Sequence, residues 1–215
     1  MIFSRSWRKS RHKQLRKYAA FRVPGNTDVL LITRLPWLLL IHGAAAAVTV
    51  RSDTAVPWWS LCILPLISTA VLIAVSIRER ENGLAGFFRY NSAFYLLVSV
   101  SLLELAVTVC IHDANPYALL VSVLVGFLTV AFLLNRLRKQ IEENTFSEEK
   151  QQGAITAGLA GVFGLGSYFL LKQIFPEQVS SALSVIAIGI LAAFTLGVCV
   201  VFWLKSVGAD SQQDR

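Results

Sequence analysis

The sequence predicts an all-α fold, a polytopic integral membrane bundle of six transmembrane helices arranged as three hairpins. Its 215 residues are 55% hydrophobic, and the apolar residues form long blocks rather than being spread along the chain. A block of about 20 apolar residues spans the ~30 Å hydrocarbon core of a bilayer as a helix. Basic residues cluster beside these blocks, which is typical of a chain that crosses a membrane several times.

The chain divides into three parts on this basis. We expect a basic interfacial segment at residues 1–28, a membrane domain at residues 29–204 and a short cytoplasmic tail at residues 205–215. The mean hydropathy of +0.59 leaves no room for a separate soluble domain. The expected spans are residues 29–50, 57–77, 93–112, 116–135, 153–171 and 179–204.

The basic segment is dense in Arg and Lys, and its first acidic residue is Asp28. Trp7, Leu15 and Tyr18 interrupt the charges at loosely helical spacing. This pattern favours a segment lying on anionic lipid, so the formal charge of +7 indicates a membrane surface and not nucleic acid. Two alternatives stay open, an organellar transit peptide and a signal peptide whose cleavage site is the alanine run at 44–47.

The first two spans carry the signals expected of membrane helices. Arg34 lies near one end of the first span, where a long side chain reaches the interface, and His42 lies near mid-depth. Pro57 opens the second span and two tryptophans follow it, as is typical of a first helical turn at the membrane boundary. The charged run at residues 78–81 ends that span.

The third span contains Glu104, a formal charge deep inside a hydrophobic segment. A carboxylate at the centre of a membrane helix costs ~2.5–3.5 kcal/mol on insertion scales, whereas each large apolar residue returns ~0.3–0.6 kcal/mol. Eleven such residues lie between Ala93 and His112 and offer roughly 3–7 kcal/mol. The span should therefore insert with a modest margin.

Glu104 belongs to a polar stripe, because Ser101, Glu104, Thr108 and His112 are spaced by three, four and four residues. Such a stripe must face protein or water, since lipid offers no hydrogen bonds. Two interpretations remain. In one, the carboxyl group joins helices by hydrogen bonds, with His42 as a neutral interhelical partner. In the other, Glu104 handles protons or cations, and His42 is its relay partner.

The last two spans are rich in small residues at four-residue intervals, which let helix backbones approach closely. We expect these spans to pack together, or one row to form an oligomer interface. The mixed-charge loop at residues 136–152 is expected to extend the fourth helix and to be a possible docking surface for a soluble partner. The two rows are Gly153, Ala157 and Gly161, and Gly189, Ala193 and Gly197.

The distribution of basic residues predicts the orientation. With the N-terminus in the cytoplasm, 18 of the 20 Lys and Arg residues lie on the cytoplasmic side, and Arg51 and Lys172 lie outside. The positive-inside rule therefore places both termini in the cytoplasm of a multi-pass cell-membrane protein.

Catalytic motifs are missing from the sequence. It has neither a His-Glu-x-x-His nor a Cys-x-x-Cys pair, and no phosphate-binding loop or nucleophile elbow. A half-site at Cys110, His112 and Asp113 is too small to predict a metal. We therefore expect no cofactor and no metal, and a non-enzymatic accessory, scaffold or regulatory subunit that assembles with itself or a membrane partner. The alternative is a small proton- or cation-coupled transporter or channel component using Glu104, and an intramembrane enzyme is a more distant one.

Overall fold

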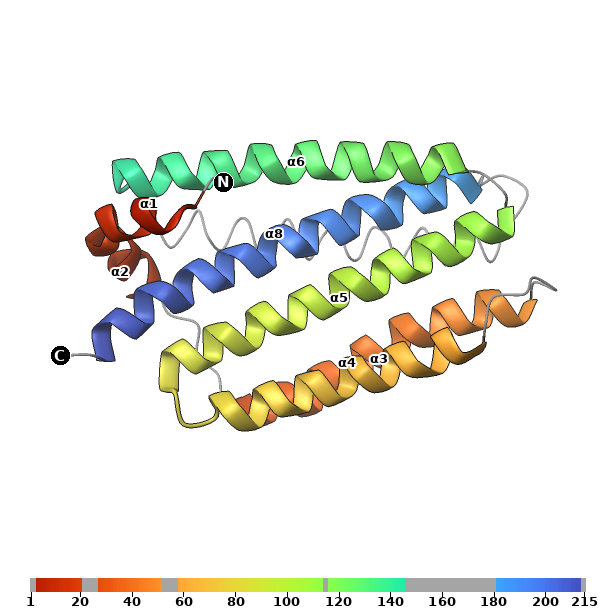
Figure 1. Ribbon diagram of the computed structural model, residues 1–215, viewed down its shortest axis with the longest axis horizontal. Helices are drawn as coiled ribbons and strands as arrows, with labels where there is room; N and C mark the ends of the chain where they lie inside the picture. Colours follow the sequence, from red (N-terminus) through yellow and green to blue (C-terminus); the bar gives the residue numbers. More distant parts are fainter. Residues whose placement is uncertain (1–2, 21–26, 52–57, 114–115, 146–180, 214–215) are drawn as a thin grey trace.

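The computed structural model describes residues 3–20, 27–51, 58–113, 116–145 and 181–213. Within these residues the protein is all-α and has seven helices (Figure 1). The predicted fifth span lies outside the described residues. The helices are α1 (Arg5–Ser10), α2 (His12–Ala20), α3 (Thr27–Arg51), α4 (Trp58–Glu79), α5 (Gly83–Asp113), α6 (Pro116–Glu143) and α8 (Ser181–Gln213).

Five of the described helices, α3, α4, α5, α6 and α8, are long and apolar enough to cross a membrane. By length and composition they make the chain a multi-pass membrane protein, which confirms the predicted class in its coarser form. Their apolar stretches are Leu31–Thr49, Cys62–Glu79, Gly83–Ile111, Leu119–Glu143 and Leu183–Ala209.

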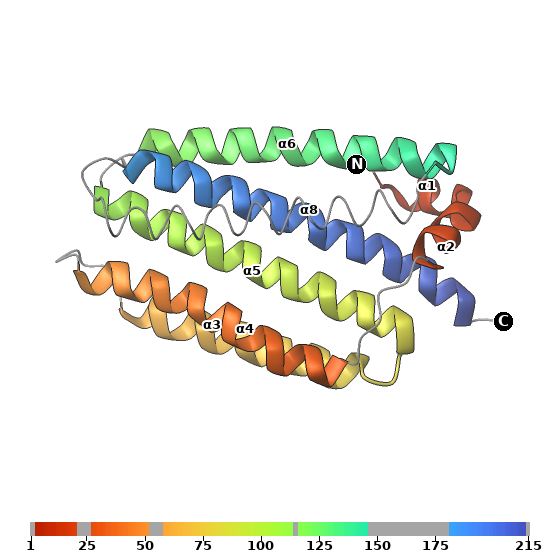
Figure 2. The same cartoon turned by 180° about the vertical axis from the view of Figure 1, so that it is seen from behind.

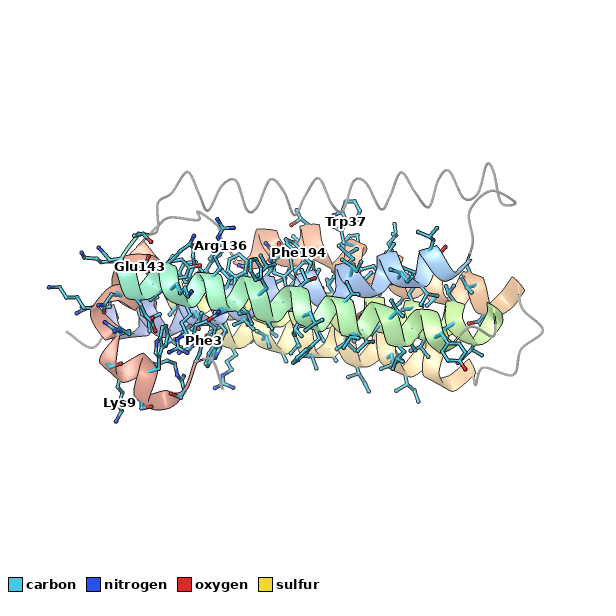
Figure 3. All side chains as sticks on the ribbon, turned by 90° about the horizontal axis from the view of Figure 1, so that it is seen from above. Phe3, Lys9, Trp37, Arg136, Glu143 and Phe194 are labelled. Carbon is cyan, nitrogen blue, oxygen red and sulfur yellow. The ribbon has the colours of Figure 1, made fainter. Side chains whose placement is uncertain are left out.

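Large apolar side chains on the outer faces of the bundle agree with this class. Trp37 on α3 is 63% exposed and projects from the bundle (Figure 3), and Phe127 on α6 is 70% exposed. An exposed apolar surface of this extent is unfavourable in water but is the normal surface of a helix in contact with lipid tails. The interior is correspondingly small and lies between helices.

Helix α5 occupies the centre of the bundle. It packs most extensively against α8 on one side and contacts α3 and α4 on the other (Figures 1 and 2). Its buried apolar side chains form the main core together with residues of α3 and α8. Of the helices predicted to form three hairpins, α3 and α4 pack against each other. α5 and α6 touch only weakly, because α8 lies between them.

Two helices extend beyond their predicted bounds. α5 begins at Gly83, ten residues before the expected start of the third span, because Phe87, Phe88 and Tyr90 are buried against protein at the end of the bundle. α8 continues to Gln213 through residues expected to form a polar tail. Burial between helices, and not hydropathy, extends both of these ends.

The turn between α4 and α5 is held by Glu79. Its carboxylate accepts hydrogen bonds from Asn82 Nδ2 at 2.9 Å and from the Arg89 guanidinium at 3.1 Å. Gly83 then starts α5 with a φ of +53°, a backbone conformation that glycine adopts without strain. Glu79, one of the two acidic residues in the charged run at 78–81, is therefore buried and paired.

The N-terminal basic segment is helical and packs against the bundle. Trp7 Nε1 donates a hydrogen bond to Glu142 Oε1 of α6 at 2.7 Å, and the Arg8 guanidinium lies 4.8 Å from the centre of the Trp203 ring of α8. Leu15 is completely buried. The apolar face of this segment therefore contacts α6 and α8, where the sequence predicted contact with lipid.

Gly208 permits the closest part of this packing. A Cβ atom at Gly208 would lie 2.3 Å from the carbonyl oxygen of Leu15, so only glycine lets α2 and α8 meet here. Lys205 Nζ lies 5.2 Å from the centre of the Tyr18 ring on the same side of α2. Burial raises the pKa of the Tyr18 phenol, so the ring packs as a neutral group beneath the ammonium.

A second close approach joins α6 to α8. A Cβ atom at Gly126 would lie 2.6 Å from the Ala193 Cβ and 3.3 Å from the Gly189 carbonyl oxygen. A Cβ at Gly197 would make ordinary contact with Val130 of α6. The small-residue row of the last span thus faces α6 in the described part of the chain.

We predict that Gly126→Ala destabilises the protein by about 1–3 kcal/mol, because the added methyl group overpacks the α6–α8 contact. Adding Ala193→Gly should restore most of the loss, since it removes the atom that the new methyl group meets. Unfolding in mixed micelles measures both effects. Gly43→Ala is the matched control, because a Cβ there meets nothing within 4 Å. Equal effects at Gly126 and Gly43 would contradict this account.

Candidate functional site

The candidate site lies between α3 and α5 and is built around His42 and Glu104. On α3, His42 falls in the same row as Leu38 and Ala45, both of which are completely buried in the main core. That row faces α5, so the His42 imidazole lies in the α3–α5 interface beside its apolar neighbours. Only 3% of the His42 side chain and 10% of the Glu104 side chain are exposed.

The structure brings three of the predicted site residues into one chain of hydrogen bonds. His42 Nδ1 lies 2.7 Å from Glu104 Oε2, and His42 Nε2 lies 3.0 Å from Ser101 Oγ. Ser101 is completely buried, and its hydroxyl also donates to the Leu97 carbonyl at 2.9 Å. Both ring nitrogens of the histidine therefore have partners on α5.

These bonds restrict where the protons lie. While the Ser101 hydroxyl donates to Leu97, its oxygen must accept from His42 Nε2–H. A second proton must then lie between His42 Nδ1 and Glu104 Oε2, on either the ring or the carboxyl group. Both arrangements leave the pair without net charge, which is the least costly state for titratable groups in hydrocarbon.

A state with one proton fewer is also compatible with the geometry. If the Ser101 hydroxyl rotates toward His42 Nε2, the neutral ring donates from Nδ1–H to an ionised Glu104. The second carboxyl oxygen, Glu104 Oε1, is buried and has no hydrogen-bond partner among the described residues. An ionised Glu104 would therefore carry one buried oxygen that no described residue stabilises.

The other members of the predicted stripe lie apart from this chain. The Thr108 hydroxyl donates to the Glu104 carbonyl at 2.8 Å, within its own helix. His112 lies near the end of α5, and its side chain is outside the described residues. Of the small-residue rows, Gly189 and Ala193 contact α6 through Gly126. The other row, at Gly153, Ala157 and Gly161, lies outside the described residues.

A second polar contact between the same helices was not predicted from sequence. The Arg34 guanidinium donates to Asn91 Oδ1 and lies 4.8 Å from the centre of the Phe94 ring. Asn91 is completely buried, and its amide also donates to the Phe87 carbonyl. The sequence placed Asn91 in a loop before the third span. Only the earlier start of α5 puts it inside the helix, opposite Arg34.

The order Ser101, His42, Glu104 has the connectivity of a catalytic triad, in which a base activates a hydroxyl and a carboxylate orients the base. A nucleophile must also reach its substrate and have donors nearby for the developing oxyanion. Ser101 is buried in the middle of α5, where backbone N–H groups are engaged in the helix. The arrangement therefore fits interhelical bonding better than nucleophilic attack.

Among the residues that the structure describes, no group of three His, Cys, Asp or Glu side chains is placed to hold a metal ion. The chain matches no protein-family model, no curated protein and no solved structure. Its class is thus defined by its own features, as an all-α multi-pass membrane protein with a buried Ser–His–Glu chain between two spans.

We predict that His42 and Glu104 are energetically coupled. His42→Leu and Glu104→Leu should each destabilise the protein, because each leaves the other polar group buried without its partner. The double variant should recover a coupling energy of about 0.6–1.7 kcal/mol, the range measured for hydrogen bonds within membranes. Mixed-micelle unfolding of the four proteins gives this value. Thr108→Val, which removes a bond within one helix, should change stability little, and strictly additive effects at His42 and Glu104 would refute the pairing.

Proposed function

We propose that this protein is a non-enzymatic membrane subunit, an accessory, scaffold or regulatory protein that assembles with itself or with another membrane protein. The observation that carries the proposal is that polar side chains inside the bundle form hydrogen bonds between helices. His42, Ser101 and Glu104 bond to one another between helices, and Arg34 bonds to Asn91 in the same way. These groups hold α3 to α5.

Hydroxyl groups at the α5–α8 interface support the same proposal. Ser99 donates to the Ala192 carbonyl at 2.8 Å, and Ser92 donates to the Cys199 carbonyl at 3.1 Å. Ser99 is buried and Ser92 is half-buried, and each hydroxyl bonds to a backbone oxygen of the neighbouring helix. Polar groups on both sides of α5 thus stabilise a fixed arrangement of helices, which suits a subunit that presents a surface to a partner.

A second candidate function is proton handling at Glu104, in a small transporter or channel component. It is favoured by the buried oxygen Glu104 Oε1, which lacks a partner among the described residues, and by the 2.7 Å hydrogen bond between His42 Nδ1 and Glu104 Oε2. Loss and return of a proton at this bond would couple the charge of the site to the position of the Ser101 hydroxyl. Transport also requires access from both membrane faces.

Glu104→Gln separates the two functions. The amide can bond to His42 Nδ1 through either its oxygen or its N–H, so a structural role predicts nearly unchanged unfolding and unchanged assembly in native electrophoresis or co-purification. The amide cannot release a proton, so a transport role predicts loss of proton flux in liposomes containing a pH-sensitive dye. Wild-type flux that disappears in a folded Glu104→Gln variant would replace the scaffold proposal with the transport one.

Labelling with a fluorophosphonate probe tests the enzymatic alternative in the same preparation. A buried structural Ser101 should not react, and Ser101→Ala should leave the labelling pattern unchanged. Covalent labelling that depends on both Ser101 and His42 would instead establish a nucleophile and overturn the non-enzymatic proposal.

The proposed orientation places both termini in the cytoplasm, with six spans between them. Reporter domains fused at residue 1 and at residue 215 should therefore both be active only as cytoplasmic reporters. A periplasmic or extracellular signal from either fusion would contradict an even number of spans or the positive-inside assignment. Fusion at residue 52, after α3, should report the opposite face.

A further inference from the structure

A cavity of about 220 Å³ lies between α2 and the end of α6, at the end of the bundle where the membrane-spanning stretches of α6 and α8 finish. It is lined by Lys13, Gln14, Lys17 and Asn144. Three of these residues come from α2 and one from the turn that ends α6. The lining residues that the structure describes are polar, and two of them are basic.

The walls of the cavity are held by contacts outside it. The opposite face of α2 is buried, with Leu15 and Ala19 completely inaccessible. Gly208 of α8 allows α2 to approach closely, and the hydrogen bond from Trp7 to Glu142 ties the preceding helix to the end of α6. The cavity is therefore preformed by packing, and a ligand would bind without first ordering the segment.

Asn144 reaches the cavity through the conformation that ends α6. Its φ is +53°, and the Thr145 N–H donates to the Gln140 carbonyl while the Asn144 N–H donates to the Ile141 carbonyl. These two bonds close the helix in the Schellman arrangement, with asparagine at the left-handed position. The backbone is satisfied by these bonds, so the amide side chain stays available to a ligand.

The lining has the charge and hydrogen-bonding groups of an anion site. Lys13 and Lys17 are one helical turn apart on α2, and both are exposed toward solvent. Gln14 Oε1 is buried and has no hydrogen-bond partner among the described residues. Among the described acidic residues at the end of α6, Glu142 is bonded to Trp7 and Arg138, and neither it nor Glu143 lines the cavity.

We propose that this cavity binds a phosphate ester. The ammonium groups of Lys13 and Lys17 bind the phosphate oxygens, and the Asn144 amide donates to one of them. The Gln14 side chain lines the same cavity beside the two lysines. Two sources supply this chemistry, the headgroup of an anionic phosphoglycerol lipid and a soluble phosphate ester such as glycerol phosphate.

The location favours the lipid as the source. The cavity lies beside the ends of the membrane-spanning stretches, where headgroups are concentrated. Lys9, another exposed lysine at this end, points away from the bundle (Figure 3) and lies outside the cavity lining. A specific site at Lys13 and Lys17 is therefore distinguishable from a general attraction of basic residues to an anionic surface.

The test titrates the full-length protein in neutral detergent micelles with phosphatidylglycerol, and in parallel with phosphatidylcholine and with glycerol phosphate, followed by native mass spectrometry and thermal unfolding. The Lys13→Gln/Lys17→Gln variant should bind phosphatidylglycerol about 10- to 30-fold more weakly, as expected for two lysines near an anionic group. The matched control, Lys9→Gln/Lys139→Gln, also loses two exposed positive charges and should change binding less than about threefold.

Asn144→Gly provides a second variant that keeps the fold, because glycine accepts the positive φ and only the amide is lost. It should weaken binding while leaving the unfolding temperature of the ligand-free protein unchanged. Competition by glycerol phosphate at matched concentration would support the site and assign it to a soluble ligand. Equal losses in the cavity variant and its control, or no preference of phosphatidylglycerol over phosphatidylcholine, would overturn the proposal.

Discussion

The absence of water inside a bilayer is the constraint on which this structure depends. A polar group within the hydrocarbon must find its partner in the protein, because lipid tails neither donate nor accept hydrogen bonds. Helix α5 meets this requirement on two sides. Its polar side chains bond to His42 and Arg34 of α3, and its serine hydroxyls bond to backbone carbonyls of α8. The position of α5 at the centre follows from these partners as much as from its apolar surface.

Pairing of titratable groups is the second consequence of the same constraint. A 2.7 Å hydrogen bond joins His42 Nδ1 to Glu104 Oε2, so neither group is buried without a partner. Pairing lowers the cost that a lone carboxylate would impose, about 2.5–3.5 kcal/mol on insertion scales. The same pair of side chains can bind or lose one proton. Its geometry is therefore compatible with both a structural role and proton handling. Only the response to removal of the proton separates them.

The end of the bundle near α1 and α2 lies in a different environment from the membrane interior. Water and lipid headgroups are available there, so charged side chains do not need protein partners, and several lysines are exposed. What holds α2 in place is close packing, permitted by the missing side chain of Gly208. The cavity beside Lys13 and Asn144 is a product of that docking, since its walls come from two helices that only the packing brings together.

The sequence by itself determined the class of the protein, because the length and hydropathy of a span are local properties of the chain. It also singled out Glu104 and His42, since a titratable residue in an apolar block is visible without a structure. The tertiary structure decided which residues meet. The bond between His42 and Ser101 joins positions 59 apart in the chain, and α8 separates α5 from α6. No local sequence pattern predicts either arrangement. The contact of Arg34 with Asn91 could not be predicted from the sequence for the same reason. Burial against neighbouring helices, and not hydropathy, decides where helix α5 begins.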